Sequence, residues 1–278
     1  MKFAATFCTL SDIDQNKPYV FRGDLEKAFN ICKENEFDGL EIALNSPEDL
    51  DLAILDRCID KTHLQISAFS TDLIYTQDRL SFFSPYSGDR EALIDRLKKI
   101  VDLAVKYNHA PIIIGDILGS EDVAGCDRQE IKQKIFEFTK SILDYSASRN
   151  VGLLFEVVNQ FGFSYGKSIK ETADFIRAFN SPYIKLLIDT HHIYHQKLSV
   201  YDVMTKNADL IGYVHLCDSN LQAIGAGKIE FAPFFQALRM TSYDGYLCSK
   251  ATSFPTSESV LKQTSAAFIS HCIELVCI

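Results

Sequence analysis

The chain has 278 residues, of which 47% are hydrophobic and 23% are charged, so it can bury a large core. Its formal net charge of -9 argues against nucleic-acid binding, which requires clustered Lys and Arg. No stretch approaches the roughly 20 uninterrupted apolar residues of a membrane span, and the first residues form too short an apolar run for a signal peptide. The eight cysteines form no C-x-x-C pair, which predicts buried free thiols in a reducing compartment. We therefore expect a cytoplasmic protein.

Eight short runs rich in Ile, Val, Leu and Phe recur along the chain. Most of them do not alternate apolar and polar residues, which is typical of parallel strands covered on both faces. The predicted strands are Lys2–Cys8, Asp38–Leu44, Leu64–Ser70, Ala110–Asp116, Val151–Val158, Tyr183–Thr190, Ile211–Asp218 and Gly245–Ala251.

Longer amphipathic segments lie between the predicted strands. The clearest is Arg90–Tyr107, where apolar residues recur at helical spacing opposite charged ones. The pattern around Val200–Asn207 is the weakest. The other predicted helices are Asp24–Asn35, Pro47–Thr62, Arg128–Arg149, Ser168–Phe179, Glu230–Met240 and Ser257–Cys277.

Eight successive βα units favour a closed parallel barrel over an open doubly wound sheet. No G-x-G-x-x-G turn follows the first predicted strand, which also disfavours a dinucleotide-binding fold. No shift in composition marks a domain boundary, so the prediction is a single (β/α)8 TIM-barrel domain over residues 1–278. The sequence leaves the oligomeric state open, including a homo-oligomer.

Two long connections, Asp72–Asp89 and Ile117–Asp127, follow predicted strands. In a barrel they lie on the face where active sites are built, and loops of this length are usually functional. We expect them to form lids over a pocket for a small molecule.

Three consecutive predicted strands end in potential metal ligands, Glu156, Asp189 and His215. The carboxyl ends of barrel strands converge at the mouth of the pocket, and carboxylates and imidazoles are ligands for divalent cations such as Zn, Mn or Mg. A single carboxylate at a strand end could instead be a helix N-cap or an ion-pair partner. Glu41 on the second strand and Asp116 at the end of the fourth are further candidates for lining the pocket, with a structural role as the alternative.

The motifs E-x-x-N, D-T-x-H and H-x-x-D-S-N with a later G-x-G follow the fifth, sixth and seventh predicted strands. This combination resembles the xylose-isomerase-like barrel superfamily, which includes sugar isomerases and ketose 3-epimerases. The resemblance covers essentially the whole chain and is strongest over residues 151–231.

The resemblance implies that Glu156, Asp189 and His215 bind a divalent metal such as Mn, Mg, Zn or Co. It also implies that Asn159 and His192 contact a sugar or polyol substrate, although His192 could instead be a metal ligand. In the epimerases the metal polarises a carbonyl, and two glutamates transfer a proton through an enediolate. One of these glutamates would be Glu156. The other would stand on the eighth strand, where this sequence has Lys250.

Four positions depart from the epimerase pattern. Lys250 replaces a glutamate that is both ligand and base, and Leu221 and Gln160 stand where substrate-binding arginines are usual. Gly162 stands where some epimerases have an acid. An ammonium about 4 Å from a dication would cost on the order of 8 kcal/mol at an effective dielectric of about 20. We therefore expect Lys250 either to replace the cation in an ion-pair cluster with Glu156 and Asp189, or to weaken metal binding. A neutral Lys250 acting as a base is the alternative.

The leading functional prediction is a sugar or polyol isomerase/epimerase-like enzyme that enolises a carbonyl substrate, with Glu156 and Lys250 as catalytic residues. The alternatives are a non-catalytic or metal-free barrel that binds a small polyol, and an inosose-type dehydratase. An abasic-site endonuclease is disfavoured, because the third and fourth strands lack the extra histidines and the chain is acidic.

Overall fold

The predicted strands are present in the computed structural model, which describes residues 1–84, 86–118, 128–156 and 168–273. The strands form one sheet in the order β2-β1-β3-β4-β5-β6-β7-β8-β9, and β1 also pairs with β9. This chain order with a closing pair is the topology of a parallel barrel. The strands are β1 (Lys2–Cys8), β2 (Phe21–Arg22), β3 (Gly39–Ala43), β4 (Gln65–Ser70), β5 (Ile112–Ile114), β6 (Leu153–Glu156), β7 (Ile184–Asp189), β8 (Ile211–Leu216) and β9 (Tyr246–Ser249).

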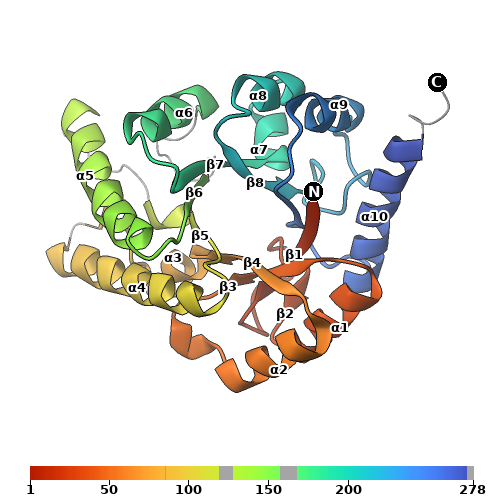
Figure 1. The fold of residues 1–278 in the computed structure, drawn as a ribbon, viewed down its shortest axis with the longest axis horizontal. Helices are drawn as coiled ribbons and strands as arrows, with labels where there is room; N and C mark the ends of the chain where they lie inside the picture. The colour runs from red at the N-terminus through yellow and green to blue at the C-terminus, as the bar shows by residue number, and fades with distance from the viewer. Residues whose placement is uncertain (85, 119–127, 157–167, 274–278) are drawn as a thin grey trace. The chain divides into compact units, whose positions relative to one another are not determined.

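Helices alternate with these strands along the chain (Figure 1). The α-helices are α1 (Leu25–Glu34), α2 (Leu52–Thr62), α3 (Asp72–Asp78), α4 (Ser87–Lys106), α5 (Arg128–Ala147), α6 (Ile169–Ala178), α7 (Thr190–His195), α8 (Val200–Lys206), α9 (Ala232–Thr241) and α10 (Ser257–Ile273). Two 3-10 helices, η1 (Pro47–Asp49) and η2 (Asp116–Leu118), lie between them. No helix in the described ranges is long and apolar enough to cross a membrane.

The first of two compact units comprises residues 1–42, 51–67 and 188–278. Its strand β9 pairs in parallel with both β1 and β8, with Ala4 opposite Cys248 and Cys248 opposite His215. Helices α1 and α2 lie side by side, as do α8 and α9 (Figure 1). Asp51 caps α2 by accepting backbone hydrogen bonds from Ala53 and Ile54, and a cap of this kind contributes about 1 kcal/mol.

The second unit comprises residues 43–50 and 68–187. Within it β4, β5, β6 and β7 pair in parallel, and the strands are almost completely buried because they carry continuous apolar runs. The long helices α4 and α5 pack against each other. The single-domain organisation of the whole chain stays a prediction.

The structure differs from the sequence prediction in three short elements. Strand β2 adds two residues beside β1, and helix α7 follows β7 directly. The predicted connection Asp72–Asp89 is not a loop in its first half, since Asp72–Asp78 forms helix α3 with Leu73 and Ile74 fully buried, and its role as a lid stays a prediction. In the other predicted lid, η2 covers Ile117 and Leu118, and residues 119–127 lie outside the described residues.

Candidate active site

Asp189 ends β7 and caps α7. Its Oδ1 accepts hydrogen bonds from the backbone N–H groups of His191 at 2.7 Å and His192 at 3.2 Å. These bonds fix the carboxylate, whose Oδ2 lies 3.9 Å from Nδ1 of His215. The sequence presented the N-cap and the metal ligand as alternatives, but the cap uses only one of the two oxygens. Both roles are therefore compatible with this geometry.

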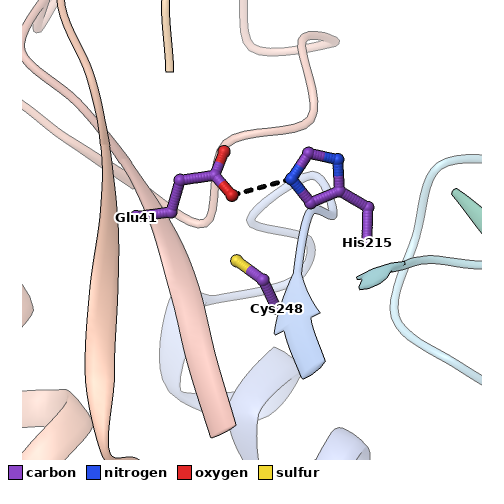
Figure 2. Close-up of side chains that lie close together, drawn as sticks. All are labelled: Glu41, His215 and Cys248. Carbon is purple, nitrogen blue, oxygen red and sulfur yellow. Dashed lines mark hydrogen bonds and ion pairs between the residues drawn. The ribbon is translucent and has the colours of Figure 1, made fainter. Parts of the chain in front are cut away.

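His215 is fully buried on β8, and Glu41 of β3 holds its imidazole (Figure 2). The Glu41 Oε2 atom lies 2.7 Å from Nε2 of His215, and Glu41 is only 1% exposed. A carboxylate oxygen accepts a hydrogen bond from a ring N–H, so this contact fits the tautomer with the hydrogen on Nε2, in which Nδ1 faces Asp189. A carboxylate behind one imidazole nitrogen is the usual arrangement around a metal-binding histidine.

Cys248 of β9 lies beside this pair. Its sulfur and the donor atoms of Glu41 and His215 lie within 4.8 Å of one another (Figure 2). Burial, with the charge of Glu41 adding to it, raises the pKa of the Cys248 thiol well above its ordinary value. Without a metal the thiol is therefore protonated at neutral pH. Among the described residues the second oxygen of Glu41, Oε1, has no hydrogen-bond partner although it is buried.

Tyr213 completes the packing around His215. Its ring meets the imidazole edge-on at 5.6 Å, and its hydroxyl lies 2.7 Å from Oγ of Ser67. Burial raises the pKa of Tyr213 well above its ordinary value, and the phenol also contacts the Cys248 thiol. The phenol therefore stays neutral. It restricts the imidazole to one orientation.

Lys250 follows β9 directly and is only 8% exposed. Its backbone N–H donates to Leu216 O at 3.0 Å, which extends the pairing of β9 with β8. The pKa values of the Cys217 and Cys248 thiols are raised, mainly by burial. The positive charge of Lys250 lowers the pKa of each thiol and so offsets part of this increase. The ammonium of Lys250 therefore exerts its charge on the cluster that contains Cys248.

The D-S-N and G-x-G motifs after β8 form a loop that is held by the side chain of Asp218. Its Oδ1 accepts hydrogen bonds from the backbone of Ser219 at 2.6 Å and Ile229 at 3.0 Å, and its Oδ2 accepts from Gly225 at 2.9 Å. Burial would raise the pKa of Asp218, but these backbone hydrogen bonds and one from Gly227 outweigh it and hold the pKa below its ordinary value. The two motifs thus encode a carboxylate that holds its own loop.

The remaining predicted residues fall in several places. Glu156 lies at the end of β6 and is 4% exposed, and Asp116 is the first residue of η2. Both residues belong to the second unit, and their membership of the site stays a prediction. His192 is half-buried on α7. Asn159, Gln160 and Gly162 lie outside the described residues. Leu221 has a left-handed backbone with φ 61° and accepts a hydrogen bond from Thr252 N at 2.7 Å.

His215 and Asp189 offer the types of ligand atom that a divalent cation binds. A neutral imidazole nitrogen and a carboxylate oxygen 3.9 Å apart can both reach one ion, because metal bonds of about 2.1 Å place opposed ligands roughly 4 Å apart. The buried charge of Lys250 opposes such an ion. Glu41, Tyr213 and Cys248 are the residues that the sequence left without a defined role around His215.

Comparison with known proteins shows that the chain is similar to sugar epimerases. A sequence profile of the family described as xylose isomerase-like TIM barrel matches residues 29–270. An L-ribulose 3-epimerase of Methylomonas sp. (strain DH-1) is 24% identical over 235 residues, which cover 82% of this chain and 78% of the relative. A 3-dehydro-D-guloside 4-epimerase of Escherichia coli (strain K12) is 21% identical over 265 residues, which cover 93% and 98%.

Solved structures give the same result. The D-allulose 3-epimerase from Methylomonas sp. in complex with D-allulose superposes with a TM-score of 0.78 at 20% identity, covering 97% of this chain and 96% of that one. These comparisons confirm the predicted TIM-barrel fold. They also confirm, at the level of relatives, the prediction of a sugar isomerase/epimerase-like enzyme.

Proposed function

The chain belongs to the xylose isomerase-like TIM barrel family, and from this premise we propose that it is a sugar epimerase or isomerase that enolises a carbonyl substrate. The observation that carries the proposal is the fixed His215 imidazole. Glu41 holds Nε2, and Nδ1 faces the Asp189 carboxylate at 3.9 Å. A buried imidazole with this orientation is suited to binding a cation or a substrate oxygen.

The residues proposed to hold a divalent metal are Asp189 and His215, with Glu156 as the third on the strength of the sequence pattern. A metal bound there would polarise the carbonyl of a sugar, so that the neighbouring C–H becomes more acidic. We propose that Lys250 weakens this binding, because its positive charge occupies the place of a carboxylate ligand. Its burial supports the proposal, since burial strengthens the repulsion between like charges.

The proton transfer is assigned to Glu156 and Lys250. The Glu156 carboxylate would remove the proton from the carbon next to the carbonyl, and the electron pair of that C–H bond would form an enediolate. The Lys250 ammonium would stabilise the enediolate oxygen and return a proton to the same carbon from the other side. Such a pair typically contributes a rate factor of roughly 10² to 10⁴. His192 and Asn159 are proposed to bind substrate hydroxyl groups, and Asp116 to line the pocket.

The burial of Lys250 also favours a second candidate, a metal-free barrel that binds a small polyol without chemistry. A buried ammonium beside carboxylates needs no cation for charge balance. The two candidates differ in one observable. Only an enzyme exchanges the proton next to the substrate carbonyl with solvent.

The experiment is a panel of ketohexoses, inososes and hydroxypyruvate in deuterated water, with and without Mn²⁺. The expected result is deuterium at the carbon next to the carbonyl of at least one substrate. We expect Lys250→Gln to reduce the exchange rate about 100-fold or more. Lys206→Gln, which changes a 72% exposed lysine on α8, should leave it unchanged. No exchange with any substrate would favour the binding protein, and a tight stoichiometric Mn²⁺ complex would reject the weakened metal site.

A further inference from the structure

The cluster formed by Glu41, His215 and Cys248 lies at the Nε2 side of the imidazole, opposite to Asp189. We call it the thiol cluster. Its three side chains are 1%, 0% and 0% exposed, and they come from β3, β8 and β9 of the first unit (Figure 2). The proposed function uses only the other imidazole nitrogen, Nδ1, and leaves the Cys248 sulfur without a role.

We propose that the thiol cluster is a second, alternative metal site that takes a thiophilic dication such as Zn²⁺ or Co²⁺. The three donors are one thiolate sulfur, one imidazole nitrogen and one carboxylate oxygen, all within 4.8 Å of one another. Sulfur and nitrogen donors favour Zn²⁺ and Co²⁺ over Mg²⁺ and Mn²⁺. The Cys248 thiol already interacts with the Glu41 carboxylate, and Oε1 of Glu41 is buried without a hydrogen-bond partner among the described residues, so this carboxylate has an oxygen available to a ligand.

The distances require only small movements. Zinc bonds of about 2.0 to 2.1 Å to nitrogen and oxygen and about 2.3 Å to sulfur place tetrahedral ligands roughly 3.3 to 3.6 Å apart. Glu41 Oε2 and His215 Nε2 are 2.7 Å apart, so they would separate by well under 1 Å. No donor in the cluster is more than 4.8 Å from another, so the sulfur would move by about 1 Å.

The charges of the three ligands match a dication, and the nearby charge of Lys250 favours the Cys248 thiolate while it repels the ion. Loss of the thiol proton of Cys248 to solvent leaves a thiolate, and the thiolate and the Glu41 carboxylate together neutralise a dication. The hydrogen on Nε2 of His215 transfers to Nδ1, so that Nε2 binds the metal. Nδ1–H then points at Oδ2 of Asp189, now 3.9 Å away, and Asp189 becomes the carboxylate behind a metal-binding histidine.

Occupation of the thiol cluster would exclude a metal at Asp189. A neutral imidazole offers one lone pair at a time, and the two sites need it on opposite nitrogens. A thiophilic cation would therefore convert Asp189 from a ligand into a hydrogen-bond acceptor. By this route Zn²⁺ would inhibit any activity that depends on a metal or substrate oxygen at Nδ1.

The test is cobalt binding, which is read from the absorption of the complex and needs no activity. The purified protein, incubated with Co²⁺, should bind one equivalent and show the near-ultraviolet charge-transfer band of a thiolate ligand. Cys248→Ser should abolish the band and lower the Zn²⁺ affinity at least 10-fold. Cys58→Ser, which changes a thiol on α2, should keep both. Asp189→Asn should also keep the band, because Asp189 is no ligand in this site.

Three results would overturn the proposal: no thiolate band in the unmodified protein, a band that survives in Cys248→Ser, or a band lost in Asp189→Asn. Circular dichroism melting shows whether each variant is folded. Should Cys248→Ser fail to fold, X-ray absorption of the zinc-loaded Cys58→Ser protein decides, since it must contain sulfur at about 2.3 Å. A thiolate band without deuterium exchange on any substrate would reject the proposed function and leave the thiol cluster standing.

Discussion

Two buried carboxylates of the first unit, Asp218 and Glu41, are treated very differently by the fold. Asp218 accepts backbone hydrogen bonds from Ser219, Gly225 and Ile229, all of them in its own loop. Glu41 contacts the His215 ring through Oε2 and interacts with the Cys248 thiol, while its Oε1 has no hydrogen-bond partner within the described ranges. The first carboxylate is satisfied by local backbone, whereas the second depends on side chains from other strands.

This difference separates stability from function. Backbone N–H groups cannot leave their acceptor without unfolding the loop, so Asp218 serves the fold. A buried oxygen without a partner costs about 1 to 3 kcal/mol, and such groups persist mainly where a ligand or a reaction uses them. Glu41 therefore indicates the position of the functional site, whereas Asp218, which belongs to the more recognisable motif, stabilises its loop.

The largest expected effect is that of Asp218→Ala. It leaves at least three backbone N–H groups without their acceptor, which should lower the free energy of unfolding by roughly 3 to 5 kcal/mol. Urea unfolding measures this. The matched control is Asp244→Ala, at an exposed position, which should stay within about 0.5 kcal/mol of the unmodified protein. Equal losses in the two variants would contradict a structural role for Asp218.

Glu41→Gln is the converse substitution and should affect metal binding more than folding. The amide keeps the shape of the side chain, so we expect the free energy of unfolding to change by no more than about 1 kcal/mol. Loss of the carboxylate ligand that Glu41 gives to the thiol cluster should lower the affinity for Co²⁺ at least about 10-fold. Calorimetric titration and urea unfolding of the same preparation test both parts. A destabilisation as large as that of Asp218→Ala would break the contrast between the two carboxylates.

Gly227→Ala tests how closely the loop must pack around the Asp218 carboxylate. A Cβ atom at this position would lie 2.3 Å from Oδ1 of Asp218 and 2.6 Å from Oγ of Ser219, so the loop must shift. The hydrogen bonds can partly re-form, so we expect a loss of about 1 to 2 kcal/mol in urea unfolding. Gly88→Ala on α4 is the control, since its Cβ would meet nothing within 4 Å. A loss for Gly88→Ala that matches the one for Gly227→Ala would show that the Asp218 contact is unimportant.

The strands could be predicted from the sequence because parallel strands buried on both faces require continuous apolar runs. Each of the eight predicted runs contains one observed strand, with ends that differ by two residues or less. Helices α3 and α7 were missed because seven and six residues are too few to show a helical period. Their starts depend instead on local capping, such as that of α7 by Asp189.

The site could be predicted only in part. Asp189 and His215 stand at strand ends, a position that the sequence reveals directly. The contacts of Glu41 and Cys248 with His215 depend on which strands are neighbours and in which register, and Cys248 is opposite His215 only because β8 and β9 pair in parallel. Lys250 was conspicuous because it departs from a family pattern. No local signal marks an orphaned oxygen such as Oε1 of Glu41.

The smallest expected effect is the pH dependence of the Asp218 contribution. Backbone hydrogen bonds hold the pKa of Asp218 below its ordinary value of 3.8 in spite of burial, so the folded protein binds this proton less readily than the unfolded chain. The contribution is then complete above about pH 4 and is lost as the pH falls through the folded pKa. The difference in unfolding free energy between the unmodified protein and Asp218→Asn should be constant from about pH 7 to 5 and shrink below about pH 4. Asp244→Asn, measured alongside, accounts for the general effect of acid. A difference that grows in favour of the unmodified protein as the pH falls from 7 to 5 would contradict this. It would mean that burial dominates and raises the pKa of Asp218, so that the folded protein binds the proton before the unfolded chain does.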